Sequence, residues 1–379
     1  MGKCYLAWAK DPEIRQKGGS GGFVTATLLA ALKEGLVERV LIVRRIDEFE
    51  GVPLLTDDPE EVKSCSSAHL AAPLNLSSYI PPGERVAVTV KPCDARAIIE
   101  RSKRRQIDLE DIYMVGLNCG GTFMPVRTME AVSDLFGLDP GDVLGFEVSK
   151  GKFLVEARSG TYTLPMVELE RMGYGRRDPC RYCNINIPVM ADLACGDAGV
   201  PPGMRATFVE ILTDKGDELF EAGIKTSMIE FEEAGEEEIE TRVRTDRRMS
   251  EDADMWWDEL SSMIDEDDHL SYYINELGRC IHCGSCKIVC PVCACKDDAK
   301  CLDMGREGYR ISLYNLIRLF HLMDSCIGCG QCEDVCPVDI PLTMIHQRFE
   351  RRMEKELGYR PGFEMSKPPL QEPEPGGKV

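Results

Sequence analysis

The chain of 379 residues lacks a long apolar run, an apolar leader and a basic surplus. No apolar stretch approaches the ~20 residues that a membrane-spanning helix needs. Residues 1–11 contain no long apolar core of the kind found in secretory signals. The net charge is −20, whereas a nucleic-acid partner would require a basic surface. These absences predict a cytoplasmic protein with no membrane span and no nucleic-acid partner.

Cysteine, in contrast, is abundant, with 18 residues. In a short secreted chain this number would indicate a disulfide framework. Here the chain is long, and its cysteines are grouped at the spacings of metal ligands. Metal binding is therefore the better interpretation.

Two runs near the C-terminus have the spacing C-x2-C-x2-C-x3-C-P. In ferredoxins with this run, the first three thiolates bind one cubane and the fourth reaches the other. The spacing predicts two 4Fe-4S clusters, one held by Cys280, Cys283, Cys286 and Cys336, the other by Cys326, Cys329, Cys332 and Cys290. Zinc or a redox dithiol is a poor alternative because the complete spacing occurs twice.

Three more cysteines lie between the two runs: Cys293, Cys295 and Cys301. They could be spare structural thiols or ligands of something further. Since cysteine packs readily as a small apolar residue, spare thiols are the favoured interpretation.

The N-terminal part alternates apolar helical patterns with short strand patterns. Helices are expected at 23–36, 95–105 and 125–136, and strands at 37–45, 85–90 and 111–117. Such alternation is typical of an α/β layered domain. The expected organisation is an α/β (α+β) domain at 1–235, an acidic connector at 236–269, a two-cluster ferredoxin-like domain at 270–350 and a Pro/Gly-rich tail at 351–379.

Four cysteines upstream of the ferredoxin runs could meet in the α/β domain. Cys93 and Cys119 each follow an expected strand, and strand ends form the ligand crevice of such sheets. Cys180 and Cys183 form a C-x2-C pair in a loop rich in glycine and arginine. A third 4Fe-4S cluster and four buried thiols both remain open from spacing alone.

A glycine loop precedes the first expected helix and consists of Lys17, Gly18, Gly19, Ser20, Gly21 and Gly22. Its N–H groups and the helix N-terminus could hold a phosphate. No strand is evident just before it, it matches neither common nucleotide-binding fingerprint, and a flexible turn is the alternative. A second tight turn at Gly196 and Asp197 carries a carboxylate that could reach a sugar hydroxyl or a flavin.

Basic residues are clustered at Arg101, Lys103, Arg104 and Arg105. A solvated helix face is the ordinary explanation of such a stripe. The functional alternative is a dock for an anionic substrate tail.

The segments KGGSGG, KPCDAR, NCGG, CRYC and ADLACGDAG follow one another in residues 1–235. In this order they resemble the beta subunit of coenzyme F420-reducing hydrogenases and dehydrogenases. A ferredoxin module behind that domain, with the run CPVCACKDDAKC, is most similar to the formate dehydrogenase branch of the family in methanogens.

The resemblance implies an α/β fold that holds FAD, with a 4Fe-4S cluster on Cys93, Cys119, Cys180 and Cys183. The FAD contacts would come from the glycine loop Lys17 to Gly22, from Ser66 and Ser67, and from Lys91, Asn118, Gly196 and Asp197. Around Ser66 the sequence reads SSAH, whereas the family often has a glycine–serine–aromatic pattern there.

The implied role is that of a beta subunit of F420-dependent formate dehydrogenase, with a molybdopterin-containing large subunit as partner. Electrons would pass through the clusters to FAD, whose N5 exchanges hydride with coenzyme F420, so that no side chain is expected to be catalytic. The anionic coenzyme would be held by the basic stripe or by Arg176, Arg177 and Arg181. Alternatives are a hydrogenase-type subunit, an electron relay that feeds a heterodisulfide reductase complex, and a relay without flavin.

Overall fold

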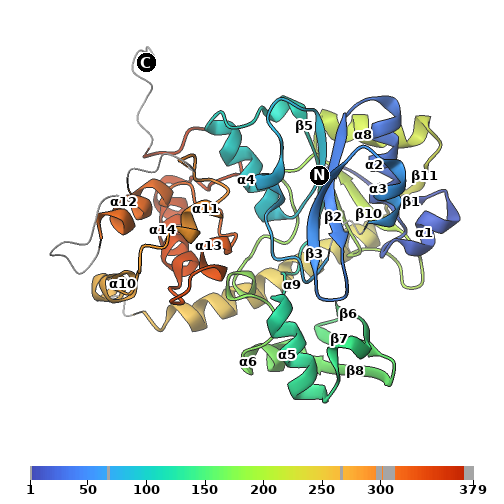
Figure 1. Cartoon of the computed structure of the whole chain (residues 1–379). Helices are drawn as coiled ribbons and strands as arrows, with labels where there is room; N and C mark the ends of the chain where they lie inside the picture. Colours follow the sequence, from blue (N-terminus) through green and yellow to red (C-terminus); the bar gives the residue numbers. More distant parts are fainter. Residues whose placement is uncertain (1, 66–68, 265–267, 296–300, 302–311, 371–379) are drawn as a thin grey trace, which may run out of the picture. The chain divides into compact units, whose positions relative to one another are not determined.

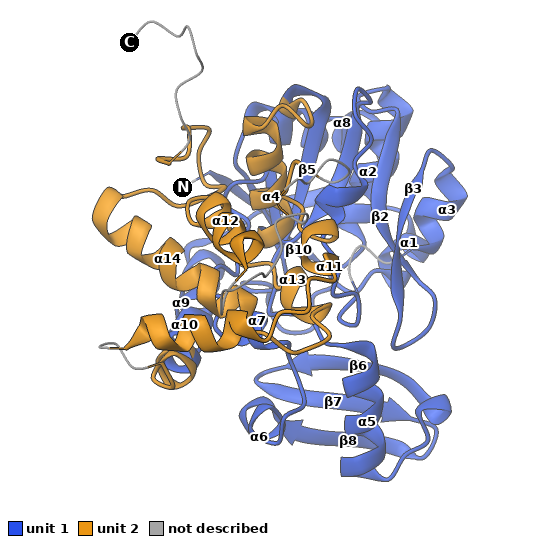
Figure 2. Ribbon diagram, turned by 60° about the vertical axis from the view of Figure 1, so that its left-hand side comes forward, with its two compact units in different colours: residues 1–92, 110–256 blue, residues 93–109, 257–379 orange. Residues whose placement is uncertain are grey.

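The computed structural model describes residues 2–65, 69–264, 268–295, 301 and 312–370, so Ser66 and Ser67 lie outside it. The chain divides into two compact units, coloured separately in Figure 2. Unit 1 consists of residues 1–92 and 110–256, and unit 2 of residues 93–109 and 257–379. The segment 93–109 therefore belongs with the C-terminal part and not with its neighbours in the sequence. Among the described residues, no helix combines the length and apolarity needed to cross a membrane.

Unit 1 contains the strands of both sheets. They are β1 (Lys3–Ala9), β2 (Arg39–Arg45), β3 (Gly51–Thr56), β4 (Val86–Val90), β5 (Ile112–Leu117), β6 (Val143–Ser149), β7 (Lys152–Ala157), β8 (Gly160–Pro165), β9 (Leu193–Gly196), β10 (Thr207–Ile211) and β11 (Ile229–Glu233). Its helices are α1 (Pro12–Lys17), α2 (Phe23–Glu34), α3 (Pro59–Ser64), α5 (Pro125–Phe136), α6 (Met166–Arg171), α7 (Asp178–Arg181), α8 (Asp214–Lys225) and most of α9 (Glu236–Ser261), with short 3-10 turns at Leu76–Tyr79, Leu109–Asp111 and Pro140–Asp142.

The main sheet has eight strands in the order β11-β1-β10-β9-β5-β4-β2-β3 (Figure 1). The pairs β2–β4, β4–β5 and β5–β9 are parallel, and the outer pairs are antiparallel. Strand β4 (VAVTV) is buried at all positions, as expected for a central parallel strand that is covered on both faces. A separate antiparallel sheet, β6-β7-β8, packs with α5 and α6 around Phe123 and Phe153.

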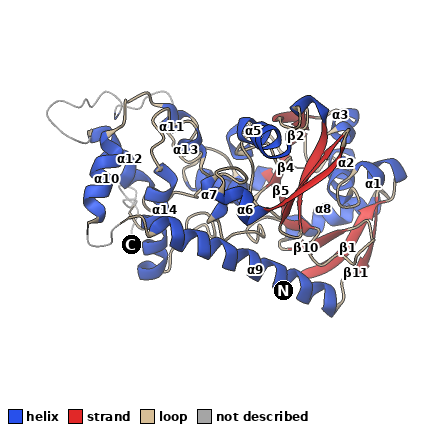
Figure 3. Ribbon diagram, turned by 90° about the horizontal axis from the view of Figure 1, so that it is seen from below, coloured by secondary structure: helices blue, strands red, loops and turns tan. Residues whose placement is uncertain are grey.

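Helices cover both faces of the main sheet, which forms the layer of strands in Figure 3. Helices α2 and α8 share one core with strands β1, β2 and β5. On the other face, Ile239 at the start of α9 packs with Leu6 and Phe208. The fold is thus a mixed α/β sandwich. The strands β4, β5 and β9 are parallel, so their carboxyl ends lie at the same edge of the sheet.

The expected strands at 37–45, 85–90 and 111–117 are present as β2, β4 and β5, and the expected helices as α2, α4 and α5. No strand stands directly before the glycine loop, as expected, because helix α1 does; the strand before α1, β1, was not predicted. It is missed by local patterns because both its partners, β10 and β11, lie about 200 residues further along the chain. The acidic stretch 236–269 begins with the long helix α9.

Unit 2 is helical. It contains α4 (Pro92–Lys103) from Cys93 onward, the end of α9, α10 (His269–Gly278), α11 (Ser285–Ile288), α12 (Leu313–Leu322), α13 (Gln331–Asp334) and α14 (Leu342–Leu357). Tyr273, Leu277 and Ile345 form one apolar cluster, and Ala97 of α4 packs with Ile327 in another. Both clusters include cysteines of the ferredoxin runs.

Candidate functional site

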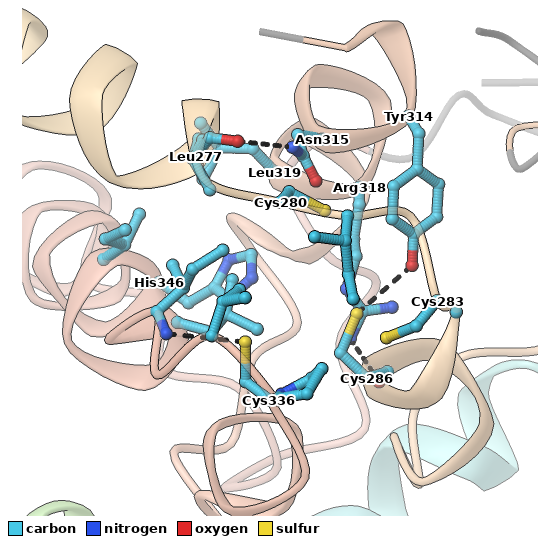
Figure 4. Close-up of a pocket in the computed structure, with 17 residues that line it drawn as sticks. Leu277, Cys280, Cys283, Cys286, Tyr314, Asn315, Arg318, Leu319, Cys336 and His346 are labelled. Atoms are coloured by element: carbon cyan, nitrogen blue, oxygen red, sulfur yellow. Dashed lines mark hydrogen bonds between the residues drawn. The ribbon is translucent and has the colours of Figure 1, made fainter. Parts of the chain in front are cut away.

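Eight cysteines of unit 2 line two separate cavities. Cavity A is lined by Cys280, Cys283, Cys286 and Cys336 (Figure 4). Cavity B is lined by Cys290, Cys326, Cys329 and Cys332. Each cavity thus combines three thiols of one run with the fourth thiol of the other run. This is the exchange of ligands that the spacing predicts for a pair of cubanes.

The backbone around the two cavities follows one repeated plan. Gly284 and Gly330 have φ of 77° and 78° and begin the short helices α11 and α13. Two residues after the first cysteine of each run, His282 (φ 59°) and Gly328 (φ 65°) also have left-handed backbone. Left-handed backbone at these positions points N–H groups toward the thiols, and His282 N lies 3.4 Å from Cys280 Sγ.

Burial governs the chemistry of these thiols. It raises the pKa of Cys326 to about 12 and the pKa values of Cys329 and Cys332 well above the ordinary value. Buried thiolates are unstable unless positive charge accompanies them, and bound metal supplies such charge while displacing the protons. The donor set, the enclosure and the N–H groups therefore fit iron–sulfur clusters.

The three intervening cysteines do not line either cavity. Cys293 packs beside Cys290 and Ile327, and burial raises its pKa. Cys295 is exposed and Cys301 is half-buried. The packing of Cys293 agrees with a structural thiol.

A larger cavity of about 610 Å³ lies in unit 1, where the glycine loop meets the ends of β5 and β9. We call it the glycine-loop cavity. Eight of the residues expected to bind the cofactor line it: Lys17, Gly18, Gly19, Ser20, Gly22, Asn118, Gly196 and Asp197. Its volume is in the range of ligand and cofactor sites, about 300–1,000 Å³. Parallel strand ends are where open α/β sheets bind ligands.

Close packing explains the glycines of this cavity. A Cβ on Gly18 would stand 2.4 Å from Gly22 N, and one on Gly196 would stand 2.2 Å from Asn118 Nδ2. The loop is also held from outside, since Arg205 donates to the carbonyls of Gln16 and Gly18 at 2.7 and 3.0 Å. Close packing and hydrogen bonds therefore fix the conformation of the loop, which is not a flexible turn.

Replacement of Gly18 by alanine is expected to destabilise unit 1 by about 1–3 kcal/mol, the usual cost of overpacking. The added methyl would meet backbone atoms of Gly22 that cannot move without opening the loop. Anaerobic thermal unfolding of the purified protein measures the effect. Gly19→Ala is the matched control, because a Cβ there meets nothing within 4 Å; equal destabilisation by both changes would contradict the packing argument.

Three of the four upstream cysteines lie in unit 1. Cys119 is half-buried, and desolvation of its thiol, followed by the nearby Cys180, raises its pKa to about 12. Gly121 N donates to Cys119 Sγ at 3.4 Å, and Thr122 Oγ1 lies 3.6 Å from Cys180 Sγ. Cys183 also contributes to the electrostatics at Cys119.

The fourth cysteine, Cys93, belongs to unit 2. Strand register gives it a defined relation to Cys119 in the chain. Val90 of β4 pairs with Gly116 of β5, and each cysteine follows its paired residue by three positions. Cys93 also raises the pKa of Cys329, a thiol of cavity B in the same unit.

The basic residues expected to bind the coenzyme have intramolecular partners. Lys103 and Arg104 both pair with the fully buried Glu100, at 2.7 Å each. Arg101 is buried, which lowers its pKa. Lys103 and Arg104 thus compensate the buried charge of Glu100, whereas Arg105, which follows the end of α4, is exposed.

The arginines of the CRYC loop likewise build the loop itself. Arg176 pairs with Glu170 at 2.5 Å. Arg177 donates to Thr122 Oγ1 at 3.3 Å, and Arg181 donates to the carbonyl oxygens of Arg176 and Tyr174. These contacts hold Cys180 and Cys183 in place.

Several residues of the glycine-loop cavity escaped the sequence analysis. Arg45 is the last residue of β2, Lys63 lies in the last turn of α3, and His69 follows the undescribed residues 66–68. Phe146 comes from the small sheet. For Arg45, its position at the end of an expected strand could have indicated a place at the cavity. The other residues reach the cavity through tertiary packing, which local sequence patterns do not show.

A cavity at the parallel strand ends of an α/β unit, and two four-thiol cavities in a helical unit, define a redox protein of the iron–sulfur class. Residues 276–340 match the 4Fe-4S dicluster domain. Residues 4–80 match the N-terminal part, and residues 83–237 the C-terminal part, of the coenzyme F420 hydrogenase/dehydrogenase beta subunit. The chain belongs to this family of oxidoreductase subunits, and the resemblance drawn from its motifs is confirmed.

Similar proteins extend over the whole chain. It is 36% identical to F420-dependent formate dehydrogenase 1 subunit beta of Methanococcus maripaludis, over 97% of both chains. It is 38% identical to F420-dependent formate dehydrogenase subunit beta of Methanocaldococcus jannaschii, over 97% of this chain and 98% of that protein.

Hydrogenase subunits match a smaller part of the chain. The coenzyme F420 hydrogenase subunit beta of Methanosarcina barkeri is 25% identical over 60% of this chain and 80% of its own length. A chain in the solved F420-reducing NiFe hydrogenase complex of the same organism has the same fold, with a TM-score of 0.58 and 22% identity over 69% of this chain and 94% of that chain.

Proposed function

We propose that the chain is the beta subunit of an F420-dependent formate dehydrogenase, which passes electrons from a formate-oxidising partner to coenzyme F420. The observation that carries the proposal is the presence of two four-thiol cavities and a glycine-lined cofactor cavity in one chain. Formate dehydrogenase beta subunits match 97% of the chain, whereas the Methanosarcina hydrogenase subunit matches 60%. The dicluster module therefore favours formate dehydrogenase over hydrogenase.

Each four-thiol cavity would hold one 4Fe-4S cluster. In cavity A, Ile340 N donates to Cys336 Sγ at 3.4 Å, and Tyr314 Oη lies 3.2 Å from Cys286 Sγ. Donors of this kind stabilise the negative charge of a cluster and raise its potential.

A third 4Fe-4S cluster would be held by Cys93, Cys119, Cys180 and Cys183. The equal offsets of Cys93 and Cys119 from paired strand residues support this set. Within unit 2, Cys93 acts on Cys329 electrostatically, and Ala97 of the same helix packs with Cys326 and Cys329. Electrons would pass through the two ferredoxin clusters and the third cluster to the flavin.

FAD would occupy the glycine-loop cavity, where it would convert single electrons into the hydride that coenzyme F420 exchanges. The loop would bind the cofactor through backbone N–H groups and the N-terminus of α2. Asn118 lines this cavity, and a hydrogen bond from its backbone N to the carbonyl oxygen of Cys195, at 2.7 Å, fixes its position. The task of this chain's residues is orientation of two ring systems and exclusion of water, without proton transfer by a side chain.

Cations at the rim of this cavity are candidates for the anionic tail of the coenzyme, beside the basic residues named from the sequence. Lys63 lines the cavity and, among the residues that the structure describes, its ion pair is with exposed Glu60, at 2.6 Å. Lys63→Glu is expected to raise the KM for coenzyme F420 roughly tenfold, since charge-assisted contacts to anions are worth about 1.5–3 kcal/mol. The measurement is steady-state F420 reduction, with reduction of an artificial dye as internal reference. Lys225→Glu, at an exposed pair with Glu34, is the control; an unchanged KM for Lys63→Glu would exclude that lysine.

The function is tested by purification without oxygen from the natural source. A molybdenum or tungsten subunit in the complex, together with formate-dependent bleaching of coenzyme F420, is expected. A nickel subunit with hydrogen-dependent bleaching would replace the formate proposal. Iron and sulfide without FAD would reduce the chain to an electron relay.

A further inference from the structure

Arg318 of α12 lies between the two four-thiol cavities. It lines both cavity A and cavity B, and only 6% of the residue is exposed. Figure 4 shows its side chain extending toward the thiols of cavity A beside Cys286. Nη2 donates to the carbonyl oxygen of Cys286 at 2.8 Å. The guanidinium is thus enclosed and held by the backbone of a ligand loop.

This buried charge has no carboxylate partner among the residues described. Its Nε is fully enclosed and has no hydrogen-bond acceptor in that part of the chain. A buried charge that is left without a partner is strongly unfavourable. Instead of an aspartate or glutamate, the thiol of Cys286 in cavity A and the thiols of Cys290 and Cys332 in cavity B line the space around Arg318. Anionic clusters bound in these cavities would compensate its charge.

One other side chain lines both cavities, His346 of α14. It is buried, and its Nδ1 has no partner within the described structure. Burial and the neighbouring Arg318 lower the pKa of His346 to about 3. The guanidinium of Arg318 stays protonated in proteins, so it places a permanent positive charge between the two cavities.

We propose that Arg318 is an electrostatic positioning residue for both clusters: it raises their reduction potentials together and weakens the repulsion between two reduced clusters. The proposal rests on the two clusters of the proposed function. Each reduction adds one electron to a cluster and breaks no bond. Because four thiolates already make each cluster negative, the added charge is stabilised by a cation in a medium of low dielectric constant. A cation between the two cavities would therefore stabilise the reduced form of both clusters.

The test is an anaerobic redox titration of the full-length protein, followed by visible absorption and electron paramagnetic resonance. Arg318→Met is expected to lower the one-electron reduction equilibrium constant of both ferredoxin clusters at least tenfold, which is about 59 mV for each. Arg318→Lys keeps the charge and is expected to stay within threefold of the parent protein. Arg352→Gln, which removes an exposed charge of the same unit, is the control and is expected to change neither constant.

The outcomes separate this inference from the proposed function. Parent protein without two reducible 4Fe-4S clusters would contradict the proposed function itself. Two clusters whose constants are the same in Arg318→Met and in Arg352→Gln would overturn the role of Arg318. If Arg318→Met fails to assemble clusters, assembly in Arg318→Lys supports the need for a cation, and failure of Arg318→Lys as well would overturn it in favour of a purely structural side chain.

Discussion

Cys119→Ala is expected to disconnect the ferredoxin clusters from the glycine-loop cavity. Loss of an outer partner of a metal site already costs about 10–100-fold in affinity, so loss of a proposed ligand is expected to lower occupancy of the third cluster by at least about 100-fold. Cys119 lies close enough to Cys180 for the two thiols to interact electrostatically. Formate-dependent F420 reduction should then fall in proportion.

Iron content and two activities test this prediction. Iron per chain should drop by about one third, from three clusters to two, while formate-dependent reduction of a dye that accepts electrons from the ferredoxin clusters is retained. Cys4→Ala is the matched control, since Cys4 lies on β1 and its thiol donates to the carbonyl of Gly2. Unchanged iron and F420 activity in Cys119→Ala would contradict the third-cluster assignment.

The second large effect is expected at Glu350 of α14. Its carboxylate accepts from Arg96 Nη2 at 2.6 Å, and both side chains are almost fully enclosed, at 3% and 2% exposure. Arg96 also donates to the carbonyl oxygens of Ile327 and Pro361. Glu350→Leu leaves a buried guanidinium without its carboxylate, and the expected loss in the free energy of unfolding of unit 2 is about 3–5 kcal/mol.

Anaerobic urea unfolding, followed by loss of cluster absorbance, measures this loss. The double variant Arg96→Met/Glu350→Leu is expected to recover most of it, because a buried ion pair is roughly replaceable by apolar side chains. Glu356→Ala removes an exposed partner of Arg352 and is expected to cost at most about 0.5 kcal/mol. Equal effects of Glu350→Leu and Glu356→Ala would show that burial of the pair contributes nothing.

Local patterns were sufficient for much of the fold. Strands β2, β4 and β5 and helices α2 and α5 were predicted because apolar periodicity and turn residues act over a few positions. Strand β1 escaped prediction because its pairing depends on β10 and β11, far along the chain. The membership of α4 in unit 2 was equally hidden, since the contacts of Arg96 reach residues more than 200 positions away.

The same division applies to the sites. The sequence by itself determined the two ferredoxin ligand sets, because cluster chemistry requires thiols at a spacing that is local and occurs twice. It also located the glycine loop, whose close approach to neighbouring backbone excludes side chains. Only the tertiary structure decided that Lys103 and Arg104 neutralise Glu100, and that Arg318 stands unpaired, among the described residues, between two cavities. The sequence does not show whether a charged residue is solvated, paired or buried. Its contribution to the free energy of folding depends on which of these environments the tertiary structure provides.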